Sequence, residues 1–341
     1  MADDKTEQKN IPLGMDDIVK MLFTLSDELT VRMINSLFVK ELPPNAKVII
    51  RDTGKRRFSF TEQGIERIYA DMILEICGEI YHVEFQTVND DLILPRMFEY
   101  GFAISIEEVK SRLVRTADGM NMTYPKQYVI FVERDDNIPE DELTMKVTLW
   151  DGDVKDYRVP ILRYWKETPD SLEAKNLEPL LPLQVFNIRR DLERIAKSKK
   201  PEAEKQKLTE AKLREVIEIY RTITEKVRDL TDTQERLTIF HAEKMLDALH
   251  HLTAYLYSRY DNYNEIETEA IEMTKSIWGL VDAHNKGELQ RGKDSAHDMF
   301  MDGEQIEKIR KYSKLSDKDL AGVLVTLPQT IQSKYNLRVE V

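Results

Sequence analysis

Residues 67–86 read RIYADMILEICGEIYHVEFQ, and this stretch decides the fold of the N-terminal half. From residue 68 to residue 76 every even position is apolar, which predicts a β-strand with one face in the core. Cys77-Gly78 predicts a two-residue hairpin turn, so Ile76 pairs with Glu79 and paired residue numbers sum to 155. Asp71 then lies directly opposite Glu84, and the apolar faces of the two strands coincide in this register.

The opposed carboxylates predict a metal site. Directly opposed residues have Cβ atoms about 4.5 to 5.5 Å apart, and two negative charges at that spacing repel unless a cation lies between them. Asp and Glu oxygens with water form the hard site that Mg²⁺ prefers, and a partly hydrated ion can orient a phosphate and activate water. Gln86 emerges on the same face and can hydrogen-bond that water or phosphate. The alternative is that Asp71, Glu84 and Gln86 are only the polar face of an exposed antiparallel pair.

The surrounding sequence predicts strands alternating with helices. Apolar spacing of three and four residues predicts helices over 16–40 and 92–115. Short apolar runs predict five further pieces of sheet, over 48–50, 65–76, 79–88, 128–132 and 145–150, with 154–164 as an additional edge strand. This alternation implies an α/β (α+β) domain over 15–165, preceded by a flexible N-terminus at 1–14.

A different pattern follows residue 165. Residues 166–184 contain Pro169, Pro179 and Pro182 and predict a linker or an irregular connection between domains. Residues 185–341 predict a mostly helical C-terminal region with a break near 197–205. Near its end, Ser316 followed by Asp319 predicts the start of a helix through a capping box. The helices at this end favour a plain helical hairpin over a DNA-binding helix-turn-helix.

Composition limits the function classes. The 341 residues exceed what one core usually organises, and 41% hydrophobic with 33% charged residues fits a globular chain. The single cysteine, Cys77, excludes an intramolecular disulfide and a cysteine-based zinc site. The start of the chain is polar and no apolar run reaches about 18 residues, so we expect a cytoplasmic protein without a membrane span.

The net charge of −12 argues against nucleic-acid binding through bulk electrostatics. The stretch 47–57 is the exception, because five basic residues and one acidic residue, Asp52, give it a local charge of +4. The basic residues are Lys47, Arg51, Lys55, Arg56 and Arg57. This cluster is either a first contact for a polyanion or a solvated hairpin tip.

Asp71, followed thirteen residues later by Glu84-Phe85-Gln86 on the next strand, resembles the PD-(D/E)XK nuclease superfamily. More specifically, residues 15–165 resemble the recombination-promoting nuclease (Rpn) family of transposase-like bacterial proteins. The matching features are Asp16 with Lys20, Asp71 within 69–76, the strand 82–86, Arg96 with Tyr100, and more loosely the ending 296–320.

The resemblance implies a restriction-endonuclease-like mixed sheet flanked by helices and a metal-dependent DNA endonuclease linked to recombination, mobile elements or defence against foreign DNA. It makes Asp71, Glu84 and Gln86 catalytic, with Mg²⁺ (or Mn²⁺ or Ca²⁺) held by Asp71, Glu84 and the backbone carbonyl of Phe85. Gln86 stands where the superfamily has Lys, and an amide positions water without stabilising developing negative charge as an ammonium does. The implied partners are DNA and a second copy of the chain in a homodimer.

Several alternatives stay open. Asp16 either adds a carboxylate to the metal site or caps the first helix. Arg96 and Tyr100 are expected on one helix face, where they either contact a phosphate or stack on each other. The further DNA-binding candidates are Arg51, Lys55, Arg56 and Arg57. His82 is expected on the strand surface, and the five histidines after residue 240 are expected to be surface or core residues. The competing functions are a non-catalytic nucleic-acid-binding or assembly module on a nuclease fold and an RNA-directed nuclease.

Overall fold

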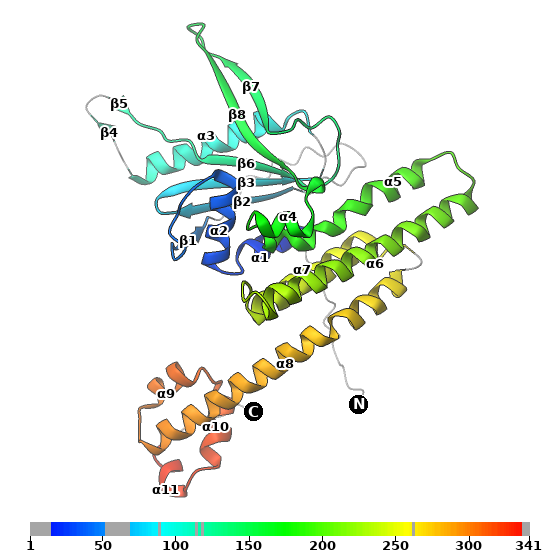
Figure 1. Cartoon of the computed structure of the whole chain (residues 1–341). Helices are drawn as coiled ribbons and strands as arrows, with labels where there is room; N and C mark the ends of the chain where they lie inside the picture. Colours follow the sequence, from blue (N-terminus) through cyan, green and yellow to red (C-terminus); the bar gives the residue numbers. More distant parts are fainter. Residues whose placement is uncertain are drawn as a thin grey trace, which may run out of the picture. The chain divides into compact units, whose positions relative to one another are not determined.

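The computed structural model describes residues 15–51, 69–87, 90–112, 115–116, 119–260 and 263–335 (Figure 1). The predicted DNA-binding residues Lys55, Arg56 and Arg57 lie outside these ranges. Contacts divide the chain into two compact units, one ending at Thr274 and the other beginning at Lys275.

The elements follow the order helix, strand, helix, strand and then helices. The strands are β1 (Val48–Ile50), β2 (Tyr69–Ile76), β3 (Glu79–Gln86), β4 (Arg115–Thr116), β5 (Gly119–Met120), β6 (Lys126–Phe131), β7 (Glu142–Thr148) and β8 (Val154–Arg163). The helices around them are α1 (Met15–Phe23), α2 (Asp27–Phe38) and α3 (Ile93–Arg112), and two 3₁₀ segments are η1 (Tyr164–Lys166) and η2 (Glu178–Ile188). The later helices are α4 (Pro169–Ala174), α5 (Arg189–Lys197), α6 (Glu202–Asp232), α7 (Ile239–Tyr257), α8 (Tyr263–Met301), α9 (Ile306–Ser313), α10 (Asp317–Val325) and α11 (Gln329–Gln332).

A six-stranded mixed sheet with the order β1-β2-β3-β6-β8-β7 organises the first unit. Strands β3, β6 and β8 run parallel, and the remaining neighbours are antiparallel. The predicted α/β class with a mixed sheet flanked by helices is therefore confirmed. The predicted edge position of 154–164 is wrong, because β8 pairs with β6 on one side and with β7 on the other.

Helices cover both faces of the central strands. On one face the Phe85 ring packs on Phe23 of α1 at 5.7 Å, and Tyr81 packs on Phe38 of α2 at 5.0 Å. On the other face α3 supplies Ile93 and Met97 to a buried cluster with residues of β6 and β8. Figure 1 shows α3 on one side of the sheet and α1 and α2 on the other. Strands β3 and β6 are thus buried on both faces, as parallel strands usually are.

The predicted single helix over 16–40 is wrong, because the structure has two helices there. Helix α1 ends at Phe23 and α2 begins at Asp27. Between them the Ser26 hydroxyl accepts a hydrogen bond from the Leu29 backbone N–H at 3.2 Å. A serine in this position caps a new helix N-terminus, and the acidic residues Asp27 and Glu28 stabilise its first turn.

The predicted connection at 166–184 is not a linker. Segment η2 is almost wholly buried, with Val185 and Phe186 fully inaccessible. The Tyr164 hydroxyl donates to the Leu180 carbonyl at 2.6 Å, and the Tyr257 hydroxyl of α7 donates to the Val185 carbonyl. Pro179 and Pro182 thus belong to a tight 3₁₀ segment that packs against α6 and α7, whereas Pro169 begins α4. The compact unit continues through this segment.

A buried carboxylate ties this segment to both ends of the unit. Glu178 is fully buried, and its Oε1 lies 3.1 Å from Arg32 Nη2 of α2 and 3.0 Å from Arg236 Nη2. Arg236 Nη2 also donates to Asn176 Oδ1 at 2.9 Å. Because a buried charge is costly unless paired, this contact favours one arrangement of α2, η2 and the turn before α7.

The helical character predicted beyond residue 185 is confirmed. Helix α5 ends at Lys197 and α6 begins at Glu202, at the predicted break. In the second unit, Ser316 caps α10 by accepting from the Asp319 N–H at 3.1 Å, and Phe300, Ile309 and Leu320 lie in a common core. Among the described residues, no helix combines the length and apolar character needed to cross a membrane.

Candidate functional site

The hairpin of β2 and β3 places Asp71 opposite Glu84, as predicted. The pairs Ala70 with Phe85 and Ile76 with Glu79 also match the predicted register. Cys77 and Gly78 have φ angles of 52° and 77°, and positive values at both central positions are the geometry of a type I′ turn. The turn therefore fixes the strand register, although the side chain of Asp71 lies outside the described residues.

The face of β3 that carries Glu84 is buried. The exposed fractions are 0% for His82 and 1% each for Glu84 and Gln86. The alternative interpretation, an exposed polar face, is wrong on this point, as is the surface position expected for His82. The cause is α3, which returns over this face and buries Met97 against Val129 and its neighbours.

Glu84 has partners on two elements. Its Oε1 lies 3.3 Å from Arg96 Nη2 of α3 and also accepts a hydrogen bond from Gln86 Nε2. Its Oε2 lies 3.7 Å from His82 Nε2. A carboxylate taken out of water needs such partners, because burial penalises its charged form.

Asp90 is a site residue that the sequence interpretation missed. Its Oδ2 lies 3.0 Å from Arg96 Nη1, so one guanidinium bridges Asp90 and Glu84. Its Oδ1 accepts from the Leu92 N–H at 3.0 Å, and its carbonyl accepts from the Ile93 N–H at 2.9 Å. The signal was present, because an aspartate shortly before an apolar helix typically forms an Asx turn, in which its side chain accepts from the N–H two residues later. Asp90 thus starts α3 and aims Arg96 at Glu84.

A chain of polar side chains fixes the tautomer of His82. Gln127 Nε2 lies 3.1 Å from His82 Nδ1 and donates to the Met97 carbonyl at 2.7 Å, while the Tyr157 hydroxyl donates to Gln127 Oε1. Because the amide nitrogen only donates, Nδ1 accepts and the proton of the neutral ring is on Nε2. That proton faces Glu84 Oε2.

Two buried oxygens near Glu84 lack a hydrogen-bond partner within the described part of the chain. They are Gln86 Oε1 and Thr87 Oγ1, at the end of β3. Buried polar atoms are normally satisfied, so each of these oxygens needs a proton donor, a water or a cation. The place is therefore suited to a hydrated ligand.

A second buried carboxylate lies at the same end of the sheet. Glu133, just after β6, lies 3.0 Å from Arg189 Nη1 and 3.1 Å from Arg190 Nε, and Arg190 also donates to the Thr87 carbonyl at 3.2 Å. Burial raises the pKa of Glu133, and the two guanidinium groups oppose that rise. The sequence carried no local signal for the burial of Glu133, because its partners are more than fifty residues away.

The remaining predicted site residues are dispersed. The Gln86 carbonyl accepts from the Val132 N–H, on the side of β6. Successive carbonyls of a strand point to opposite sides, so the Phe85 carbonyl points toward Ala70 of β2. There, hydrogen bonding within the sheet competes with metal ligation. Asp16 lies in the first turn of α1, and its side chain is outside the described residues. Arg51 Nε lies 3.1 Å from Glu75 Oε2, and the Tyr100 ring lies 6.0 Å from the His82 ring.

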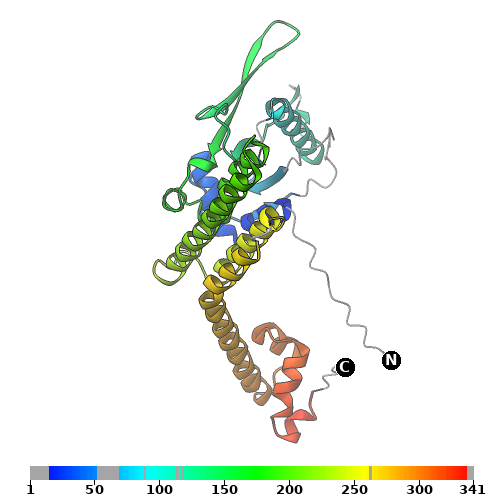
Figure 2. The same ribbon diagram turned by 90° about the vertical axis from the view of Figure 1, so that its right-hand side faces the viewer.

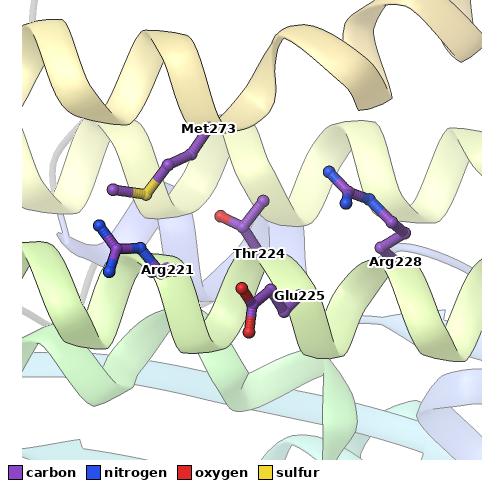
Figure 3. A pocket seen from close by; sticks show the side chains of 5 residues that line it. All are labelled: Arg221, Thr224, Glu225, Arg228 and Met273. Carbon is purple, nitrogen blue, oxygen red and sulfur yellow. The ribbon is translucent and has the colours of Figure 1, made fainter.

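A separate hollow lies on the helices and contains none of these residues. Figure 3 shows it between α6 and α8, lined by Arg221, Thr224, Glu225, Arg228 and Met273. Arg221 is already paired with Glu218 at 3.0 Å, and Thr224 donates to the Tyr220 carbonyl. This hollow therefore has the ordinary chemistry of a helix surface.

Comparison with models of protein families, with curated proteins and with solved structures found no match. Within the described residues, no group of three or more His, Cys, Asp or Glu side chains is arranged to hold a metal ion. The predicted second carboxylate, Asp71, is not among these side chains, because its side chain is outside the described residues.

Replacement of Arg96 by methionine separates a structural role in the ion pairs with Glu84 and Asp90 from the predicted phosphate contact. We expect a loss of about 3 to 5 kcal/mol in the free energy of unfolding, because the buried Glu84 and Asp90 carboxylates lose their shared cation. Urea denaturation measures this loss, with the exposed Arg134→Met as control. Unchanged stability together with a flatter salt dependence of DNA binding would instead favour the phosphate-contact role.

Proposed function

We propose that this chain is a divalent-metal-dependent DNA endonuclease of the PD-(D/E)XK type, related to the Rpn family. The observation that carries the proposal is the register that sets Asp71 directly opposite Glu84, with Gln86 next on the same face of β3. The mixed sheet with helices on both faces is consistent with that superfamily. The proposed substrate is the phosphodiester backbone of DNA, linked to recombination, mobile elements or defence against foreign DNA.

The donor set fits a hard cation. Two carboxylates, the Gln86 amide oxygen and the Thr87 hydroxyl are all oxygen ligands, and the last two lack a partner within the described residues. Mg²⁺ prefers such oxygens and keeps several of its waters. Asp71 and Glu84 would hold the ion, and a bound ion would supply Lewis-acid polarisation and a more acidic water.

Gln86, His82 and Arg96 would each have a different role around Glu84. Gln86 Nε2 holds Glu84 Oε1, which leaves the amide oxygen of Gln86 available to orient a water molecule. His82 presents an Nε2 proton toward the other carboxylate oxygen and limits its rotation. Arg96 lies between Glu84 and Asp90 and brings a positive charge to the place where a phosphate would enter.

The test uses pure protein and supercoiled plasmid with Mg²⁺, Mn²⁺, Ca²⁺ or a chelator. We expect nicking with Mg²⁺ or Mn²⁺ and none with chelator. A parallel reaction with a structured RNA separates the DNA from the RNA substrate class. Absence of cleavage with every ion and both substrates would overturn the proposal.

One observation favours the competing function, a non-catalytic nucleic-acid-binding or assembly module. Glu84 is 1% exposed and already paired with Arg96, as in a structural ion pair. In that case DNA binding would be independent of metal, and wild-type protein would leave the plasmid intact. Binding isotherms with and without chelator distinguish the two functions.

Gln86 gives a second test of the same site. Gln86→Ala removes the hydrogen bond to Glu84 and should cost about 1 to 3 kcal/mol of transition-state stabilisation, or roughly ten- to a hundredfold in nicking rate. Gln86→Lys should keep metal-dependent activity, because an ammonium can hold Glu84 and stabilise developing charge. The exposed Gln234→Ala is the matched control. A real activity that is indifferent to Gln86→Ala would remove this residue from the mechanism.

A further inference from the structure

Strand β7 forms an open edge of the sheet. Among the strands that the structure describes, it is the last in the order and pairs with β8 alone. Figure 2 shows the β7-β8 hairpin standing out from the rest of the sheet. An edge strand presents backbone N–H and C=O groups that can pair with another strand.

The backbone alternation shows which groups face outward. Hydrogen bonds from Ile161 N to Asp141 O and from Leu149 N to Asp153 O flank the ladder. Antiparallel ladders alternate between bonded and non-bonded pairs, so the odd residues from 141 to 149 bond to β8. The N–H and C=O groups of Glu142, Thr144 and Lys146 therefore point away from the sheet.

The side chains of this edge are complementary to a second copy of themselves. A two-fold axis at Thr144 pairs residues whose numbers sum to 288, so Glu142 lies opposite the partner's Lys146 and Leu143 lies opposite the partner's Met145. In this register the outward-facing N–H and C=O groups of the two β7 strands meet as hydrogen-bonded pairs. Shifting the sum to 286 or 290 keeps even residues paired with even ones but places Glu142 opposite a threonine. The sum 286 also sets Lys146 opposite the partner's Glu140, but Glu140 precedes β7 and already pairs with Arg163 and Lys166. The sum 288 therefore pairs opposite charges within the strand itself.

The surrounding charges are balanced by that partner. Arg158 lies 3.2 Å from both Glu142 Oε1 and Asp156 Oδ2, which leaves this cluster with one excess negative charge. Lys146 stands across the ladder from Asp156 of this cluster, but it is exposed and makes no ion pair among the described residues. In the same register Leu149 lies beside the partner's Pro139. The next residue, Trp150, is 98% exposed in the single chain.

We propose that the chain forms a two-fold symmetric dimer in which β7 of each copy joins the two sheets into one. The interface is isologous, since each surface contacts its own copy. It is small, so we expect association at about 10 to 100 µM, the weak end of specific interfaces. The inference rests on β7 and not on the proposed nuclease site.

Sedimentation equilibrium of the full chain, without metal or DNA, tests the dimer. Thr144→Pro removes an outward N–H and should give a monomer, while the β8 ladder and the circular dichroism spectrum stay unchanged. Lys146→Glu should weaken association by roughly tenfold or more, through like charges at two symmetric places. The double variant Glu142→Lys with Lys146→Glu restores opposite charges and should recover the dimer.

Lys155→Glu on β8 is the control and should associate like wild type. A wild-type chain that stays monomeric up to about 100 µM would overturn the proposal. A dimer that is indifferent to Lys146→Glu, or that the double variant fails to restore, would also overturn it. These outcomes are independent of plasmid cleavage, so failure of the dimer and failure of the nuclease function are distinguishable.

Discussion

Replacement of Glu84 by glutamine should abolish metal-dependent DNA cleavage, with a loss of about a hundredfold or more in nicking rate. The amide keeps the size of the side chain and can still accept from Gln86 and Arg96, so the fold is retained. What disappears is the negative charge that would hold a divalent cation opposite Asp71. Initial nicking rates at matched Mg²⁺ measure the effect.

The controls for this experiment come from the same hairpin. Asp71→Asn should have the same effect, since both carboxylates belong to one proposed site. Glu79→Gln, at the other end of β3 and paired with Lys126, should leave cleavage unchanged. Thermal unfolding of all three variants reports whether they are folded. Undiminished cleavage by folded Glu84→Gln would show that this carboxylate holds no catalytic ion.

Removal of everything after residue 170 should leave a chain that aggregates or stays unfolded, whereas a fragment ending at residue 274 should fold. The shorter fragment lacks η2 and α7, which pack against α1 and each other. It also exposes the apolar surface that Val185, Phe186 and their neighbours cover in the whole chain. Burying such side chains is the main favourable term in folding, so the sheet layer loses its support.

Circular dichroism and size-exclusion chromatography of the two fragments measure this difference. The sequence interpretation placed a domain boundary in 166–184 and implies the opposite result, a folded fragment ending near residue 170. A cooperative thermal transition in that short fragment would restore the predicted boundary. Folding of both fragments would show that the helices after residue 184 add little to the core.

The hairpin was predictable because its determinants are local. The alternation around Met72 and Leu74, and the positive φ angles that Cys77-Gly78 adopts, lie within twenty residues. The break in the first helix was also local, but the capping role of Ser26 was overlooked beside a continuous apolar spacing. These features required no knowledge of the rest of the chain.

The burial of the site could not be predicted in this way. Periodicity showed that Glu84 and Gln86 lie on the other face of the strand from the core-facing residues. It did not show that α3 would cover that second face. Likewise, proline content suggested a linker at 166–184, while the tertiary contacts of Leu180 and Val185 make the segment η2 part of the core. Partners such as Arg189 for Glu133 are far apart in sequence, and no local pattern identifies them.

The contact of Arg32 and Arg236 with Glu178 has a consequence for synthesis on the ribosome. Arg236 follows Arg32 by 204 residues, and its Glu178 partner lies between them. At about 5 to 20 residues per second, roughly 10 to 40 seconds pass between the emergence of the two arginines. During that interval the apolar faces of the nascent strands are not yet covered by α7, so chaperones that bind nascent chains have a long time in which to bind them.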